Sequence, residues 1–200
     1  MLVTAESCER NKEPILRVLQ PELAQARAVL EIGSGTGQHA VYLAAGLPQL
    51  TWQPSEVEEL VPELAERVRL EGGANLAAPI ALDVRILPWP ALRVDALFSA
   101  NTLHIMSWPA VEDFFRGAAA VLHPGGRLCV YGPFNYGARY TSDSNRQFDL
   151  WLKARDPESG IRDFEALQGL AQAAGLAFSA DHTMPANNRL LVWRAQARAS

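Results

Sequence analysis

The sequence predicts an α/β fold: a three-layer sandwich around a seven-stranded, mostly parallel sheet whose last strand is antiparallel. Across the 200 residues, short runs rich in Val, Ile and Leu alternate with longer segments of helical periodicity, which is the pattern of successive βα units. A glycine-rich segment lies between the first such run and the first helical segment. Two strand candidates close the chain and are separated only by 183–188, which is too short for a helical crossover, so they should pair as a hairpin.

The individual elements follow from the same patterns. We expect strands at 28–32, 50–53, 79–82, 94–100, 127–131, 177–182 and 189–194. We expect helices at 38–45, 57–71, 109–122 and 164–174, with Gly175 ending the last one. A further N-terminal helix should dock on the sheet through Ile15, Leu16 and Leu19. Segment 133–160 has weak periodicity apart from a possible short helix at 145–153, so it is predicted to be an insertion that covers a site as a lid.

Composition favours one globular domain spanning residues 1–200. Hydrophobic residues make up 48% and charged residues 20% of the chain, far from the signature of disorder. The formal net charge of −4 offers no basic field for nucleic acid. Cys8 and Cys129 have no metal-type spacing, no metal site is expected, and no apolar run is long enough to span a bilayer. These features predict a cytoplasmic protein with no membrane partner.

The glycine loop predicts the cofactor. Gly33, Gly35 and Gly37 form a G-x-G-x-G pattern between a strand and a helix, where the backbone turns sharply and passes close to a ligand. A dinucleotide loop is more often G-x-G-x-x-G, and a phosphate-binding P-loop requires a Lys that is missing here. S-adenosylmethionine (SAM) carries a sulfonium and an ammonium group, so the adjacent Glu31 suits a cationic ligand. Ser34 of the loop is also expected to bind the cofactor. The alternative is a tight turn without a ligand. The order of elements with a closing antiparallel strand is, by fold analogy, that of class I SAM methyltransferases.

Polar residues after the next three strands extend the predicted cofactor site. Glu56 lies nineteen residues past Gly37 (56 minus 37), where Rossmann-like folds place an acid for the ribose hydroxyls. Asp83 and Val84 end the third strand near the expected adenine position, and Asn101 follows the fourth. An acid at a helix N-terminus is the alternative for Glu56, and a cap or turn residue is the alternative for Asp83.

His104 is the candidate catalytic base. It follows the fourth strand, where open α/β sheets bind ligands, and its ordinary pKa near 6.5 would let it accept a proton. A helix cap or a packed core histidine is the alternative, because many methyl transfers need only alignment of the nucleophile. Thr102-Leu103-His104 replaces the planar-nitrogen motif of amino methyltransferases, so a small-molecule O-, N-, S- or C-methyltransferase is favoured.

Five segments carry a more specific resemblance that covers almost the whole chain. They are 9–15 (ERNKEPI), 33–40 (GSGTGQHA), 52–55 (WQPS), 131–134 (YGPF) and 184–188 (MPANN). In these segments the chain resembles the uncharacterised methyltransferase-like family that includes methyltransferase-like protein 26. The resemblance implies a class I SAM-dependent fold but no settled substrate. Many relatives are expected to have Asp where this chain has Glu56, which keeps the carboxylate.

Residues of these segments that do not build the ordinary fold are the predicted substrate contacts. They are Arg10, Asn11, Tyr131, Asn135, Tyr136, Tyr140, Asn187 and Asn188. Arg10 and Asn11 are expected to precede the N-terminal helix and form a lid, with a solvated helix cap as the alternative. For the two hairpin asparagines the alternative is turn geometry. Trp151 is expected to pack within the lid.

The sequence therefore predicts a SAM-dependent methyltransferase acting on a small molecule. A non-catalytic SAM-binding sensor or interaction protein is the main alternative, because no recognisable catalytic signature is present. An NAD-linked oxidoreductase is a third hypothesis, disfavoured by the glycine spacing and the final hairpin. A nucleic-acid methyltransferase is disfavoured by the acidic balance.

Overall fold

The structure is a computed structural model that describes residues 2 and 4–197. The helices are α1 (Glu6–Glu22), α2 (Gln38–Gly46), η1 (Glu58–Leu60), α3 (Val61–Glu71), α4 (Trp108–Val121), α5 (Asp143–Arg155), α6 (Phe164–Ala173) and η2 (Pro185–Asn187). The strands are β1 (Ala28–Ile32), β2 (Thr51–Glu56), β3 (Ile80–Ala81), β4 (Val94–Ala100), β5 (Leu122–Gly132), β6 (Phe134–Asn135), β7 (Arg162–Asp163), β8 (Leu176–Thr183) and β9 (Arg189–Ala195).

Seven strands form the main sheet in the order β3-β2-β1-β4-β5-β9-β8. The pairs among the first five are parallel, whereas β9 runs antiparallel to both β5 and β8. The predicted architecture, including the closing hairpin, is thus confirmed. The chain order reverses between β1 and β4, which creates a switch point where ligands bind beyond the carboxyl ends of strands.

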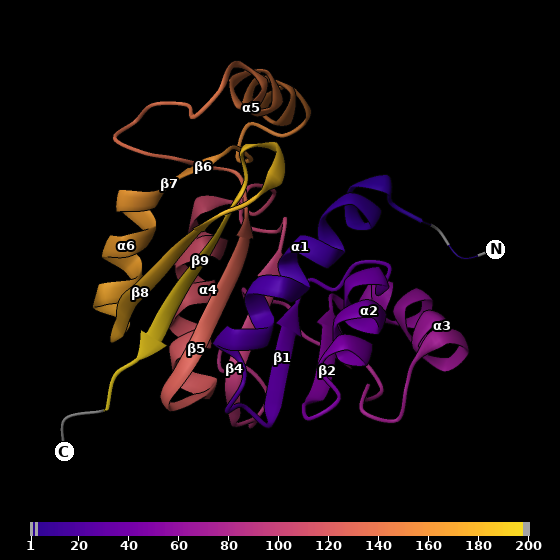
Figure 1. Ribbon diagram of the computed structural model, residues 1–200. Helices are drawn as coiled ribbons and strands as arrows, with labels where there is room; N and C mark the ends of the chain where they lie inside the picture. The colour runs from indigo at the N-terminus through magenta and orange to yellow at the C-terminus, as the bar shows by residue number, and fades with distance from the viewer. Residues whose placement is uncertain (1, 3, 198–200) are drawn as a thin grey trace.

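Helices cover both faces of the sheet (Figure 1). One apolar cluster joins α1 and α2 to the sheet through buried residues such as Ile15, Leu43 and Trp52. The other joins α4 and α6 to the opposite face through residues such as Phe114 and Leu167. The central strands β1 and β4 are largely buried on both faces, which explains their mostly apolar sequences.

Strand β2 is longer than predicted, because Pro54 does not end it. Its register against β1 continues through Glu31↔Pro54 and Ile32↔Ser55. The Trp52 N–H donates to the Asn75 carbonyl on the side away from β1. Backbone N–H directions repeat every two residues in a strand, so the nitrogen of Pro54 faces away from β1, as that of Trp52 does. The absence of an N–H on Pro54 therefore removes no hydrogen bond to β1. Glu56 is consequently the last strand residue rather than the residue after a turn.

Other boundaries also differ from the predictions. Helix α1 begins at Glu6, so the prediction that Arg10 and Asn11 precede it is wrong. Its first turns are tied to α2, where Gln38 accepts from the Ala5 N–H and donates to Glu9. Strand β5 spans eleven residues, because Leu122 already pairs with Val94 before the bulge. The helix predicted at 57–71 is divided into η1 and α3, and β3 keeps only two of four predicted residues.

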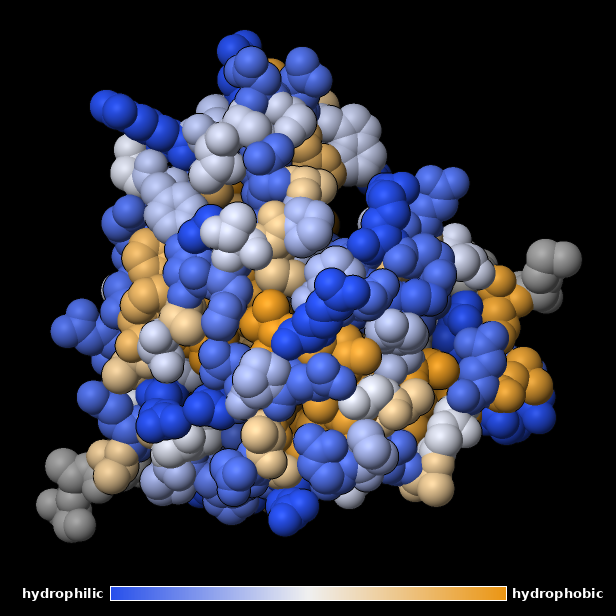
Figure 2. Space-filling model, in the orientation of Figure 1, coloured by the Kyte–Doolittle hydropathy of each residue, from blue (hydrophilic) through white to orange (hydrophobic). Residues whose placement is uncertain are grey.

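The segment predicted as an insertion contains β6 and α5, and the predicted short helix is α5. In Figure 1 α5 stands apart from the two helical layers, at the end of the molecule where β4 and β5 terminate. Figure 2 shows a largely hydrophilic surface over this α5 lobe and a notch between it and the N-terminal part of α1. Among the described residues, no helix combines the length and apolar character needed to cross a bilayer.

Candidate functional site

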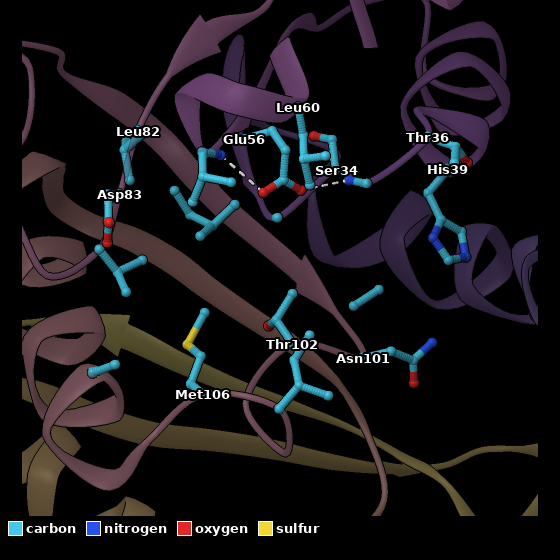
Figure 3. A pocket seen from close by; sticks show the side chains of 18 of the residues that line it. Ser34, Thr36, His39, Glu56, Leu60, Leu82, Asp83, Asn101, Thr102 and Met106 are labelled. Carbon is cyan, nitrogen blue, oxygen red and sulfur yellow. Dashed lines mark hydrogen bonds between the residues drawn. The ribbon is translucent and has the colours of Figure 1, made fainter. Parts of the chain in front are cut away.

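A cavity of about 650 Å³ opens at the carboxyl ends of β1, β2 and β4, at the switch point. This volume is within the range of small-molecule sites. Seven of the nine predicted cofactor residues line it, namely Gly33, Ser34, Gly35, Glu56, Asp83, Val84 and Asn101. Figure 3 shows Asp83 and His39 on opposite sides of this cavity, with Glu56 between them.

The glycine loop requires glycine at each of its three positions, for different reasons. All three residues have positive φ values of 70°, 54° and 81°, which side chains rarely adopt. A Cβ on Gly33 would lie 2.5 Å from Thr102 Cγ2, and one on Gly37 would lie 2.7 Å from Leu64 Cδ1. A Cβ on Gly35 would meet no atom within 4 Å. Gly33 and Gly37 therefore allow close packing, and Gly35 leaves room beside the cavity.

Glu31 lies beneath the loop and is not among the residues that line the cavity. Its carboxylate accepts the Trp52 Nε1–H at 2.9 Å and a hydrogen bond from the Ser34 side chain. Ser34 Oγ also accepts the Ser55 N–H at 3.2 Å, so these groups join the loop to β2. Burial raises the pKa of Glu31 to about 7 despite both hydrogen bonds. The structure thus places Glu31 as a support of the loop.

The two acids at the ends of β2 and β3 have different surroundings. Glu56 accepts the Gly35 N–H at 2.8 Å and the N–H of Val57 at 2.9 Å, so one carboxylate joins the strand end to the glycine loop. Asp83 forms a double hydrogen bond to Arg85, which lowers the pKa of the aspartate. Both side chains line the same cavity wall.

The chain turns sharply after β4. Asn101 has a positive φ of 59°, and its N–H donates to the Tyr131 carbonyl at the end of β5. Thr102 and Ser99 share a hydrogen bond of 2.6 Å beneath the turn. Asn tolerates this backbone conformation better than most residues, so Asn101 can serve both the turn and the cavity that it lines.

His104 is buried under the insertion and does not line the cavity. It is 7% exposed and packs edge-on against Phe148 of α5, with 5.3 Å between ring centroids. Burial, with a smaller contribution from Arg162, lowers the pKa of His104 to about 4. The packed-histidine alternative describes this environment best, and a catalytic role for His104 stays a prediction.

Three predicted substrate contacts meet one another, although none of them lines the cavity. Asn11 of α1 forms a hydrogen bond to the buried Tyr131, and the Asn188 side chain donates to the Tyr131 hydroxyl at 3.0 Å. Burial raises the pKa of Tyr131. One tyrosine therefore links the N-terminal helix to the last hairpin.

The other predicted substrate contacts are more scattered. The Asn135 Oδ1 atom is buried and accepts no hydrogen bond within the described part of the chain. Tyr136 donates to Asp181 and Tyr140 donates to Asp149. Asn187 is exposed with a φ of 58°, as the turn alternative predicts.

Two further residues lie at the surface. Arg10 is exposed and paired with Glu6. Trp151 is 49% exposed and stacks on Phe148, 5.8 Å away. None of the predicted substrate contacts lines the cavity at the switch point. Their contact with a substrate therefore stays a prediction.

Sequence reasoning missed several cavity residues. Cys8, His39, Met106, Asp156 and Glu158 also line it. His39 lies in the resemblance segment 33–40, and its position directly after the first residue of α2 was the available signal. Cys8 comes from α1, Met106 from the loop between β4 and α4, and Asp156 and Glu158 from the insertion, and only the folded chain brings them to the cavity. Among the described residues, no group of three or more His, Cys, Asp or Glu side chains could hold a metal ion.

Solved structures with the same arrangement include methyltransferases, among them SAM-dependent ones. The apo S-adenosylmethionine-dependent methyltransferase SibL matches with a TM-score of 0.80 and 20% identity, over 95% of this chain and 56% of that chain. An O-methyltransferase family 2 protein from Planctomyces limnophilus in complex with apigenin matches with a TM-score of 0.79 and 19% identity, over 92% and 56%. Human N-acetylserotonin methyltransferase in complex with SAM matches with a TM-score of 0.74 and 15% identity, over 95% and 58%.

These likenesses establish a class I SAM methyltransferase fold, and the chain spans only 56 to 58% of the length of these three proteins. A family model described as "Protein of unknown function (DUF938)" matches residues 3–195. The chain therefore belongs to the DUF938 family.

Proposed function

We propose that this protein is a SAM-dependent methyltransferase domain that acts on a small-molecule acceptor. The observation that carries the proposal is the cavity at the switch point, where the glycine loop, Glu56, Asp83 and Asn101 meet at the ends of adjacent strands. The same cofactor is supported by the human structural neighbour, which is a complex with SAM. The resemblance of five segments to the family that includes methyltransferase-like protein 26 also supports it.

The residues present fit SAM. When bound, SAM would supply a methyl group on a positively charged sulfur. Glu56 presents a carboxylate suited to the ribose hydroxyls, and Leu82, Val84 and Met106 give an apolar wall for the adenine ring near Asp83. The loop from Gly33 to Gly37 would lie against the methionine part, where Gly35 leaves space.

A small acceptor is supported by the size and charge of the molecule. The cavity of about 650 Å³ must hold both the cofactor and the reacting part of the acceptor. The net charge of −4 gives no field that would gather nucleic acid. One of the structural neighbours is a complex with apigenin, a small molecule. A cytoplasmic location stays a prediction from the sequence.

Cofactor binding is the first test of the proposal. We expect SAM and S-adenosylhomocysteine to bind by calorimetry and to raise the thermal midpoint. Glu56→Gln should weaken both by about ten- to a hundredfold, because a charged acceptor of hydrogen bonds is lost. Glu58→Gln is the matched control, since Glu58 is an exposed neighbour outside the cavity. NAD should not compete. Absence of binding by either adenosyl compound would overturn the proposal, and tight binding of NAD would favour an oxidoreductase.

The alternative of a SAM-binding sensor draws support from His104, the predicted base, which is buried away from the cavity. Methyl-labelled SAM incubated with the protein and a metabolite extract distinguishes the two functions. A labelled small product that is absent with Glu56→Gln supports catalysis. Cofactor binding without any labelled product supports the sensor.

A further inference from the structure

The cavity has one end that the cofactor residues do not explain. Asp83 and Glu56 define the side expected to hold adenine and ribose, and His39 and Asn101 line the other end (Figure 3). Cys8 also lines the cavity and lies beside His39. SAM is an extended molecule, so ribose at Glu56 directs its sulfur and amino-acid part away from Asp83. The end with His39 is therefore the end at which a methyl acceptor would meet the cofactor.

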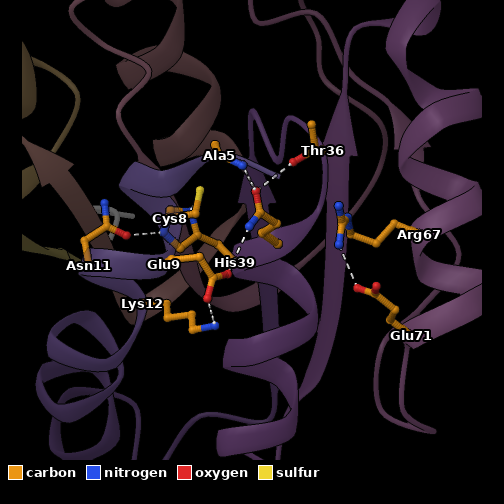
Figure 4. A network of polar contacts seen from close by, with 10 residues as sticks. Ala5, Cys8, Glu9, Asn11, Lys12, Thr36, His39, Arg67 and Glu71 are labelled. Carbon is orange, nitrogen blue, oxygen red and sulfur yellow. Dashed lines mark hydrogen bonds and ion pairs between the residues drawn. The ribbon is translucent and has the colours of Figure 1, made fainter. Parts of the chain in front are cut away.

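His39 has a distinct partner on each ring nitrogen (Figure 4). Its Nε2 atom lies 2.6 Å from Asn11 Oδ1, and its Nδ1 atom lies 3.6 Å from Cys8 Sγ. Asn11 also bonds to the Tyr131 hydroxyl. An amide oxygen can only accept, so Nε2 carries the proton and Nδ1 keeps its lone pair. The Cys8 thiol is a weak donor to that lone pair, which a hydroxyl or N–H of an acceptor can replace at little cost.

The surroundings keep His39 neutral. Burial, reinforced by Lys12 and opposed by Glu9, lowers the pKa of His39 to about 4. Helix α1 places three charged or titratable groups near His39, namely Glu9, Lys12 and Cys8. Burial raises the pKa of the Cys8 thiol to about 11, so the thiol is uncharged at neutral pH. From β4 it faces the uncharged ring of Phe98, edge-on with 6.4 Å between centroids. Nδ1 thus stays unprotonated throughout the neutral range, and its lone pair is free to accept the hydrogen of an acceptor group.

We propose that His39 takes the proton of the methyl acceptor through Nδ1, and that Asn11 is the positioning residue that fixes the required tautomer. This inference rests on the proposed methyltransferase function. A lone pair of the acceptor atom forms the new bond to the methyl carbon, and the electrons of the carbon–sulfur bond remain on sulfur. The acceptor proton passes to Nδ1, and the imidazolium then releases it to solvent. The acceptor N–H or O–H thus loses its proton to His39 and gains the methyl group.

The tautomer can be measured on the protein alone. Nitrogen-15 NMR of the histidine rings should show His39 protonated at Nε2 and unprotonated at Nδ1 from pH 5.5 to 8. Asn11→Leu, which keeps the branched side-chain shape and removes the hydrogen-bonding atoms, should leave a mixture of tautomers. A proton found on Nδ1 in the parent leaves that nitrogen unable to act and overturns the proposal. No change of tautomer in Asn11→Leu overturns the role of Asn11.

Two cofactor analogues test whether Nδ1 faces the transfer centre. Sinefungin carries an amine on the carbon that replaces the methyl-bearing sulfur, whereas S-adenosylhomocysteine has no group there, and both share the adenosine and amino-acid parts. We expect the parent to bind sinefungin more tightly than S-adenosylhomocysteine. His39→Phe should reduce this preference about tenfold, because one hydrogen bond to a charged donor is lost. His123→Gln is the control, because His123 is exposed at the opposite end of β5.

The outcomes separate this inference from the function on which it rests. Failure of S-adenosylhomocysteine to bind the parent overturns the function itself. If the parent binds both analogues but His39→Phe loses affinity for both equally, His39 lies at the amino-acid part of the cofactor. That result overturns its role as base. Unchanged binding of both analogues also overturns it. Thermal midpoints of the variants show whether each remains folded.

Discussion

At the scale of single residues, Glu31 and Glu56 show how two acids that contact the glycine loop acquire different roles. Alternate residues of a strand face opposite sides of the sheet, so Glu31 shares the face of Val29, beneath the loop and beside Trp52. Glu56 ends its strand and reaches the cavity. The motif predicts an acid near the cofactor, but only the strand alternation and the true end of β2 decide which acid lines the site.

Glu31 should make the stability of the protein depend on pH in a specific direction. Its pKa is raised from an ordinary 4.5 to about 7, so its protonated form favours folding below pH 4.5, and this contribution is lost as the pH rises through 7. Glu31→Gln keeps an acceptor for Trp52 and removes the charge. Relative to the parent, we expect it to gain about 3 kcal/mol of unfolding free energy between pH 4.5 and pH 8.

Urea denaturation at several pH values measures this difference. Glu58→Gln is the control, because Glu58 is exposed and should show no such trend. A constant difference between Glu31→Gln and the parent across the range would show that Glu31 is charged at all these pH values.

At the scale of elements, the insertion is organised by Asp149 of α5, whose side chain is fully buried. Its two oxygens accept hydrogen bonds from the Ile161 N–H at 2.7 Å, the Tyr140 hydroxyl at 2.7 Å and Lys153 Nζ at 2.6 Å. Burial alone would raise the pKa of Asp149, yet these bonds, chiefly that from Lys153, hold it below its usual value. Both ends of the insertion therefore converge on one carboxylate.

We expect Asp149→Asn to loosen the insertion without unfolding the sheet. An amide nitrogen would face Lys153 and Tyr140, so the local opening free energy should fall by about 2 to 3 kcal/mol. Hydrogen exchange should accelerate over 136–162 and stay unchanged in β4. Asp143→Asn is the matched control, since Asp143 is an exposed residue of the same helix. Faster exchange throughout the sheet would contradict a local role for Asp149.

Most elements could be predicted from the sequence, because the apolar period of each strand and helix is set by burial on the sheet. The errors lie where a tertiary contact replaces a local signal. Pro54 continues β2 because its nitrogen faces away from β1, and α1 begins early because Gln38 ties its first turn. Cys8 and His39 were missed because a contact between two helices leaves no periodic pattern in the sequence.

At the scale of the whole molecule, buried titratable groups should set the acid stability. The pKa values of His39 and His104 are lowered from 6.5 to about 4. The unfolded chain therefore binds their protons at a higher pH than the folded protein, and stability is lost as the pH falls from 6.5 to 4. Glu31 acts in the opposite direction, so the net difference is about one proton. We expect the unfolding free energy to decrease by about 1 kcal/mol per pH unit between pH 6.5 and 4.5.

His104→Gln should flatten this dependence, and Glu31→Gln should make it steeper, as measured by urea denaturation. Stability that increases on acidification in the parent would show that the two histidines become protonated in the folded state.

The position of β9 in the sheet also affects how the protein is made. Strand β9 lies between β5 and β8, and β8 has no other neighbour in the main sheet. While the ribosome is still synthesising 189–195, β5 presents an open, hydrophobic edge of the kind that pairs with other chains. The parallel half of the sheet can form during synthesis, but Tyr131 cannot meet Asn188 until the segment that carries Asn188 emerges. Nascent chains stalled before β9 should therefore depend on chaperones, whereas chains that have completed β9 should not.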